Sequence, residues 1–178
     1  MQRSILCMFG FDRSVELRAV RRRSRGVSAV AVEALEIRQL LAADVHLIHD
    51  ISPGTSSSEP SQLTRVGENL FFTAESTPGD TELWTSDGTA AGTRLVKDIA
   101  PGPASSLPRQ LTDVNGILYF SARRVHAGKF ELWRSDGTDV GTYIVADISP
   151  TSSAQLSDFT NVNGTLYFSA TDGTTGQE

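Results

Sequence analysis

The carboxylates that could do chemistry in this chain occur mainly in one motif. Segments 82–89 and 131–138 both read Glu-Leu-Trp-x-Ser-Asp-Gly-Thr, which places Asp87 and Asp136 at equivalent positions, and Asp147 follows the second copy. Their neighbours are rich in hydroxyl and carbonyl oxygens, which are the ligands that calcium prefers. The dense alternation of carboxylates found in an EF-hand loop is absent. These three residues are therefore weak candidates for a calcium site, and the sequence indicates no other cofactor.

The Asp-Gly pair also has a structural use. A carboxylate at a turn accepts a hydrogen bond from a backbone N–H about two residues further on, and glycine adopts the left-handed conformation beside it. We therefore predict that Asp87 with Gly88, and Asp136 with Gly137, form turns. This interpretation is favoured over calcium binding because it needs no residues outside the motif.

Two further turns are predicted from Asn-Gly pairs. Asn115-Gly116 separates apolar, β-favouring runs at 110–114 and 117–122, and Asn163-Gly164 has the same place one repeat later. Asn-Gly supplies the two positive φ angles of a type I′ turn, so each pair predicts a β-hairpin. The first copy has Gly-Glu-Asn at 67–69 instead, which predicts a looser turn.

The elements that position these turns repeat along the chain. Asp-Ile-x-Pro begins at residues 50, 98 and 147, and Leu-aromatic-Phe-x-Ala begins at 70, 118 and 166. With further strands expected at 130–134 and 142–148, each copy is predicted to be a four-stranded antiparallel unit of about 48 residues. Such units suit the blades of a β-propeller, with Trp84 and Trp133 in the packing between blades. The predicted fold is all-β, propeller-like and incomplete.

The repeats divide the chain into two regions. Residues 1–44 form a short basic leader, predicted to be partly helical or disordered, and 45–178 form the β-repeat region, with copies at about 46–93, 94–142 and 143–178. The last copy stops where the motif continues with Leu-Trp in the others. We therefore expect a fragment of a longer protein with further repeats.

Charge and composition exclude several classes of protein. Residues 1–44 carry 8 Lys and Arg against 5 Asp and Glu, whereas 45–178 carry 8 against 16. The acidic repeat region argues against nucleic-acid binding. No apolar run is long enough for a transmembrane helix. Cys7 is the only cysteine, so the repeat region holds no disulfide.

The repeats resemble the ELWxxDGT family, which is a bacterial family usually found as arrays in large secreted or surface proteins. The leader resembles the LEPR-x-LL leader domain through Leu35, Glu36, Arg38, Leu40 and Leu41, although Ile37 stands where that pattern has proline. The two resemblances imply a propeller-like architecture and a secreted or cell-surface location. They imply no catalytic residues.

The resulting hypothesis is a non-enzymatic exported or surface repeat protein with a scaffold, adhesion or ligand-binding role. Its expected partner is an extracellular protein or a polysaccharide. The alternative is part of a glycan-binding or glycan-active propeller protein. An active site would break the symmetry of the repeats, and neither Glu75 nor Glu131 stands out in that way.

Overall fold

A computed structural model describes residues 46–124, 128–150, 152–173 and 176–178 of the chain. These residues form ten strands and no helix, which confirms the predicted all-β class. Accordingly, this described part contains no helix that could cross a membrane. The predicted leader, with any helix in it, lies outside the described residues.

The strands form three antiparallel sheets. The first sheet contains β1 (Ser61–Val66), β2 (Asn69–Glu75), β3 (Thr81–Ser86) and β4 (Arg94–Lys97). The second sheet contains β5 (Arg109–Val114), β6 (Ile117–Arg123), β7 (Phe130–Ser135) and β8 (Tyr143–Ala146). The third sheet contains β9 (Ser157–Val162) and β10 (Thr165–Ser169). Strands follow one another in sequence order within each sheet, so every connection inside a sheet is a hairpin.

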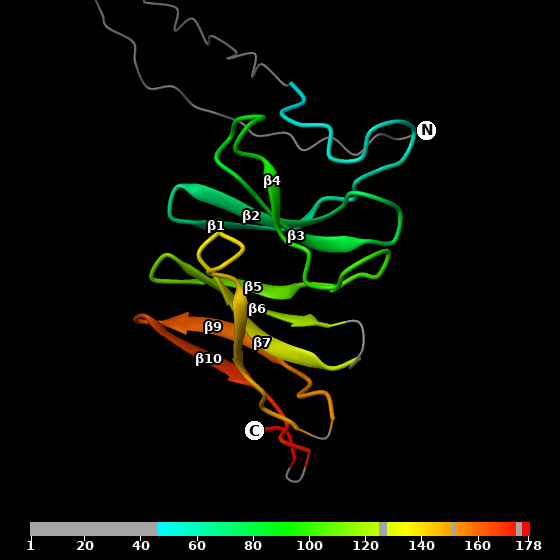
Figure 1. The fold of residues 1–178 in the computed structure, drawn as a ribbon. Coiled ribbons are helices and arrows are strands. Elements are labelled where there is room, and N and C mark those ends of the chain that lie inside the picture. The colour runs from blue at the N-terminus through cyan, green and yellow to red at the C-terminus, as the bar shows by residue number, and fades with distance from the viewer. Residues whose placement is uncertain (1–45, 125–127, 151, 174–175) are drawn as a thin grey trace, which may run out of the picture.

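The three sheets lie one above the other (Figure 1), and the first strands β1, β5 and β9 are neighbours along the stack. None of the sheets closes into a barrel, and the arrangement fits an incomplete propeller-like fold. Each sheet begins at its first strand, whereas the predicted copies begin just before the Asp-Ile-x-Pro motif. Strand β4 of the first sheet therefore falls just beyond residue 93.

The hairpins between first and second strands are two-residue turns in all three sheets. Asn115 and Gly116 have φ angles of 54° and 80°, and Asn163 and Gly164 have 51° and 82°, as a type I′ turn requires. In the first sheet Val66 pairs with Asn69, so this turn is as short as the others rather than looser.

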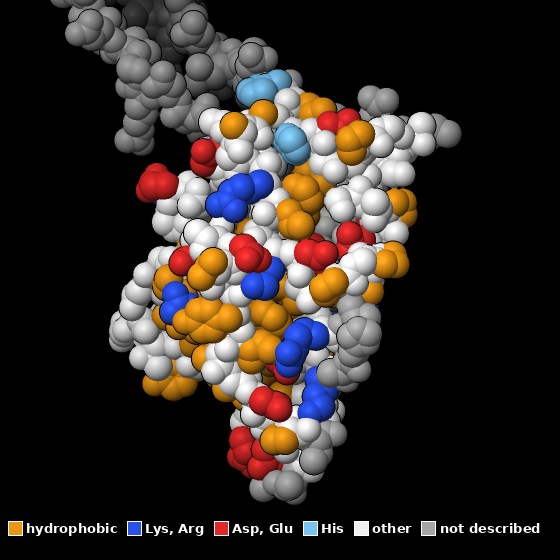
Figure 2. Space-filling model, viewed as in Figure 1, with side chains coloured by type: hydrophobic (Ala, Val, Ile, Leu, Met, Phe, Trp, Pro, Cys, Tyr) orange, Lys and Arg blue, Asp and Glu red, His pale blue; other side chains and the backbone are white. Residues whose placement is uncertain are grey.

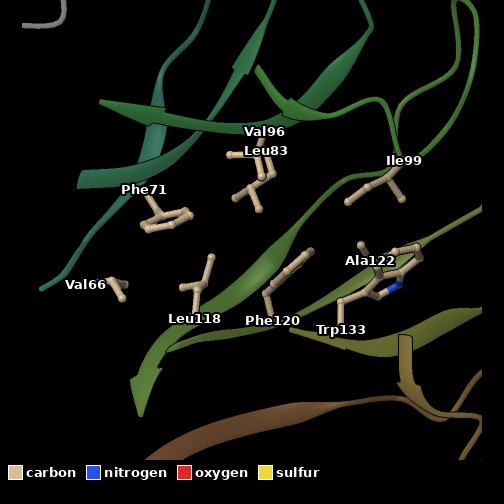
Figure 3. Close-up of a cluster of buried hydrophobic side chains, with 9 residues drawn as sticks. All are labelled: Val66, Phe71, Leu83, Val96, Ile99, Leu118, Phe120, Ala122 and Trp133. Carbon is tan, nitrogen blue, oxygen red and sulfur yellow. The ribbon is translucent and has the colours of Figure 1, made fainter. Parts of the chain in front are cut away.

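Successive sheets pack face to face through apolar side chains (Figure 3). The first sheet points three side chains toward the second sheet: Phe71, Leu83 and Val96. The second sheet contributes Leu118, Phe120 and Trp133 to the same cluster. Trp133 is buried in this interface, which confirms its predicted packing between units, whereas Trp84 is buried with Ile51 on the other face of the first sheet. Burying one such side chain contributes about 1.5–3 kcal/mol, so this interface is a main source of stability.

The first sheet, at one end of the stack, is covered on both faces. Phe71 and Phe72 are consecutive in β2 and point to opposite faces, yet they are only 1% and 0% exposed. Phe72 and Trp84 pack with Ile51, which precedes the first sheet, in a separate cluster. The strand therefore reads as a continuous apolar run rather than an alternation of apolar and polar residues.

The third sheet has one open face. Val162 is 46% exposed, although Val66 and Val114 at the equivalent positions are 4% and 7% exposed. Tyr167 is 59% exposed, whereas its counterpart Phe71 is 1% exposed. The side chains that each earlier sheet buries against the next sheet thus reach the solvent here.

We predict that the chain self-associates through this open face. The double substitution Val162→Lys and Tyr167→Lys should shift the sedimentation of the chain toward monomer, because charges oppose burial of the apolar face. Val140→Lys is the matched control, since Val140 is 89% exposed in the β7–β8 turn. Analytical ultracentrifugation over a concentration series measures the effect. A parent chain that stays monomeric at high concentration would contradict the prediction.

Candidate functional site

The Asp-Gly-Thr segments form the same turn in both four-stranded sheets. Asp136 Oδ1 accepts hydrogen bonds from the backbone N of Thr138 at 2.9 Å and from its Oγ1 at 2.7 Å. Asp87 makes the same two bonds with Thr89 at the same distances. The glycine after each aspartate has a positive φ angle, 90° at Gly88 and 89° at Gly137.

The rest of the motif closes this turn. Gly141 N donates to Thr138 Oγ1, and the hydroxyls of Ser135 and Thr142 lie 2.7 Å apart. A Cβ at Gly141 would lie 2.0 Å from Asp136 Oδ1, so only glycine fits beside the carboxylate. The same geometry recurs around Gly92. The repeated Ser-Asp-Gly-Thr-x-x-Gly-Thr pattern is thereby explained by one local network.

The second of these turns also joins the two large sheets. Phe71 of the first sheet lies against Gly137, where an added Cβ would come within 3.2 Å of the ring. Arg94 Nη2 donates to the carbonyl oxygen of Gly137 at 2.8 Å, and Lys97 Nζ lies 3.4 Å from Asp139 Oδ1. The motif therefore serves both its own hairpin and the interface.

The three weak calcium candidates occupy separate places. Asp87 lies in the β3–β4 turn, Asp136 in the β7–β8 turn, and Asp147 just after β8. Hydrogen bonds from Thr89 and Thr138 lower the pKa of Asp87 and Asp136 respectively. Within the described ranges, no group of three or more His, Cys, Asp or Glu side chains could hold a metal ion. Calcium binding remains a prediction that the geometry does not favour.

We predict that Asp136→Ala lowers the free energy of unfolding by about 1 kcal/mol, equally with calcium and with a chelator, because two hydrogen bonds of the turn are lost. Asp136→Asn should cost less, since its amide oxygen can still accept from Thr138. Chemical denaturation with both additives measures the difference. A loss confined to calcium-containing buffer, and shared by the asparagine variant, would instead identify a metal site.

The glutamate of the motif is a buried carboxylate that sequence reasoning did not single out. Glu82 is 2% exposed and fixes the linker that leaves the first sheet. Its carboxylate accepts the backbone N–H groups of Ile99, Ala100 and Ser106 at 3.0–3.2 Å and the Ser106 hydroxyl at 2.6 Å. Burial raises its pKa to about 7, against the opposing effect of these hydrogen bonds.

The second sheet stabilises the equivalent glutamate in another way. Glu131 receives two hydrogen bonds from the Arg124 guanidinium, at 3.2 and 3.0 Å. The position of Ser106 is taken by Ala154, which has no hydroxyl, and the position of Arg124 is taken by Ser76 in the first repeat. In the second repeat, alanine in place of the linker serine and arginine in place of Ser76 thus replace the hydrogen bonds between carboxylate and linker with an ion pair.

We predict that stability falls as the pH rises through 7. The folded pKa of Glu82 lies above its ordinary value of 4.5, so its contribution is complete below pH 4.5 and is lost as the pH rises through about 7. The change amounts to about 3 kcal/mol. Asp87 and Asp136, whose pKa values are lowered, act in the opposite sense but only below pH 4.

Urea denaturation between pH 4.5 and 8.5 tests this expectation. Glu82→Gln should remove most of the slope, because the amide does not titrate, whereas Glu131→Gln should leave the slope in place. A parent slope that Glu82→Gln does not alter would show that another group is responsible.

A concave surface lies along the first strands of the two large sheets. This groove, of about 490 Å³, is lined by three residues of β1 and three of β5: Gln62, Leu63, Thr64, Arg109, Gln110 and Leu111. None of them belongs to the predicted site. The sequence signal was weak, because these residues come from equivalent stretches 48 positions apart that meet only when the sheets stack.

The backbone of the groove is strained in a repeated manner. Gln62 and Gln110 have φ angles of 52° and 59°, and Asp158 in β9 has 57°, at a register shift near the start of each first strand. Such angles are costly for residues other than glycine. The strain allows the Gln62 amide to donate to the Pro108 carbonyl at 2.8 Å and to accept from Gln110 N at 3.1 Å. The floor of the groove is therefore cross-linked between sheets.

Comparisons with known proteins give no match. No family model, no curated protein and no solved structure matches the chain.

Proposed function

We propose that the chain is a non-enzymatic, exported or surface repeat protein of the ELWxxDGT type, and that its stacked sheets form a scaffold for ligand binding. The observation that carries the proposal is the groove between β1 and β5. It is open, its floor is cross-linked between the sheets by Gln62, and its lining mixes polar and apolar side chains. The leader resemblance supports export.

The disposition of the carboxylates supports a binding role over catalysis. Asp87 and Asp136 are engaged in their turns, Glu82 holds the linker, and Glu131 is paired with Arg124. A glycosidase needs two carboxylates facing one bond across a cleft. The groove lining contains none.

A glycan array combined with a hydrolysis screen tests the proposal on the full chain. We expect binding to a subset of extracellular polysaccharides without release of reducing sugar. Leu63→Asp should abolish the binding, because Leu63 is 52% exposed in the groove, and Val140→Asp is the control in the β7–β8 turn, outside the groove lining. Hydrolysis, or binding unaffected by Leu63→Asp, would contradict the proposal.

A further inference from the structure

We propose that the Asn163-Gly164 turn is a site of spontaneous modification, at which Asn163 deamidates to aspartate and isoaspartate, and that the stacking of the hairpins protects the equivalent Asn115. This inference is independent of the proposed binding function, because it rests on the backbone chemistry of two turns.

An Asn-Gly pair carries the reacting groups next to each other. The backbone nitrogen of the glycine loses its proton to hydroxide and attacks the side-chain carbonyl carbon of the asparagine. A C–N bond forms, the bond from Cγ to Nδ2 breaks, and the amide nitrogen takes a proton from water and leaves as ammonia. Water then opens the succinimide ring at either carbonyl, which gives aspartate or isoaspartate. Glycine favours the attack because it has no side chain to shield its nitrogen.

The chain has two Asn-Gly pairs, and their local sequences are nearly the same. Valine precedes both, as Val114 and Val162, and each pair has two positive φ angles. Both asparagine side chains are exposed, so water reaches either one. A large difference in rate between the two pairs must therefore come from the contacts that each turn makes in the stack.

The Asn115 side chain is held by the following hairpin. A Cβ added at Gly164 would lie 2.4 Å from Asn115 Nδ2 and 3.1 Å from its Cγ, so this amide packs directly on the Gly164 backbone. Cγ is the atom that the Gly116 nitrogen has to reach, and its rotation toward that nitrogen breaks the contact. The β9–β10 hairpin lies at the end of the stack of described sheets (Figure 1), and Asn163 is exposed there.

The attacking nitrogen is also held less firmly in the third sheet. Gly116 N donates to the Asp113 carboxylate at 2.8 Å, whereas Gly164 N donates to the neutral amide oxygen of Asn161 at 2.9 Å. A hydrogen bond to a carboxylate is roughly twice as strong as one between neutral groups. Removing the proton from Gly116 N would also place two negative charges side by side, and Coulomb repulsion opposes this.

The third sheet opens more readily than the second. Opening is needed because a type I′ turn fixes both backbone angles of the asparagine. β9 and β10 form a two-stranded sheet with one face toward solvent, where Val162 and Tyr167 are 46% and 59% exposed. β5 and β6 belong to a four-stranded sheet that is packed between the other two. Local opening costs less free energy at such an end of the structure.

The charge distribution leaves the reaction to hydroxide from bulk water. The repeat region carries twice as many acidic as basic residues, and on the face shown in Figure 2 the Lys and Arg side chains are interspersed with acidic ones. That face therefore has no broad basic surface that would concentrate hydroxide. The rate at Asn163 should rise with the pH of the buffer.

Modification at this turn should release the third sheet from the stack. Val162 pairs with Thr165 across the two-residue turn, and isoaspartate adds a main-chain methylene group there. The two strands then lose their register. Leu166 and Phe168 consequently lose the arrangement that packs them in a cluster with Leu132.

The test is peptide mapping by mass spectrometry of the full chain during incubation at mildly alkaline pH, in buffer and in concentrated urea. In buffer, Asn163 should deamidate at least about tenfold faster than Asn115, because the end of the stack opens more readily. In urea the two rates should agree within about twofold, since the stack is absent and the local sequences are nearly the same.

Asn163→Gly is the matched variant, because Gly-Gly also forms a type I′ turn and cannot deamidate. After incubation in buffer, hydrogen exchange of the β9–β10 amides should be faster in the parent than in this variant. Exchange of the β5–β6 amides should be the same in both proteins.

Equal rates at Asn115 and Asn163 in buffer, or an unmodified Asn163 in the folded chain, overturn the proposal. A ratio of rates that persists in urea assigns the difference to neighbouring residues and overturns the protective role of the stack. Unchanged exchange of β9–β10 in a chain modified at Asn163 overturns the release of the third sheet.

Discussion

The burial of one sheet face against the next is the interaction on which the rest of this structure depends. In each sheet, the Leu-x-Phe-x-Ala residues of the second strand lie on the face toward the preceding part of the chain. The opposite face presents aromatic and aliphatic side chains to the next sheet, so that Phe120 and Trp133 contact Leu83 and Val96. The same arrangement recurs one sheet further on, where Leu166 and Phe168 pack in a cluster with Leu132. A single sheet of this kind would leave two apolar faces in water. The unit of stability is therefore the pair of sheets.

Several polar features follow from this stacking. Buried linkers between sheets need partners for their backbone N–H groups, and the buried carboxylate of Glu82 in β3 supplies them. The Asp-Gly-Thr turn is brought over the neighbouring sheet, so its Gly137 carbonyl receives the Arg94 side chain. In the same way, Asn161 Nδ2 of β9 donates to the carbonyl of Asp113 at 2.8 Å. The polar groups align the sheets that the apolar faces hold together.

The local parts of the fold could be predicted from the sequence. Asn-Gly at 115–116 indicates a hairpin because the positive φ angles of a type I′ turn depend only on the residues of the turn itself. The period of the motifs indicates tandem sheets. The expected strand at 130–134 differs from β7 by one residue. The C-terminal residue keeps the register of the other repeats, since Glu178 and Ala170 exchange backbone hydrogen bonds as Glu131 pairs with Ala122.

The candidate site could not be predicted in the same way, because it depends on residues far apart in the chain. Gln62 reaches Pro108 and Gln110 only after two sheets have stacked, and its left-handed backbone is atypical of glutamine. Glu82 was visible as part of the motif, but its burial and its four donors come from the following linker. The groove is lined largely by positions that are identical in the two copies, such as Gln62 with Gln110 and Leu63 with Leu111, so only the stacking of the sheets reveals it.

A comparison of the copies gives a physical criterion for identifying the residues that build the scaffold in this repeat. Positions that are identical in the copies, such as Asp87 and Asp136, have contacts that the turn or the stack requires. Some differences are compensated inside the fold, as when Ala154 replaces Ser106 and Arg124 takes over the buried glutamate. Arg109, which stands where the other copies have serine, is exposed and packs its guanidinium on Phe130, so water solvates its remaining hydrogen-bond donors. Identity between the copies therefore marks the contacts that build the scaffold, and the exposed differences are the positions that folding leaves free to vary.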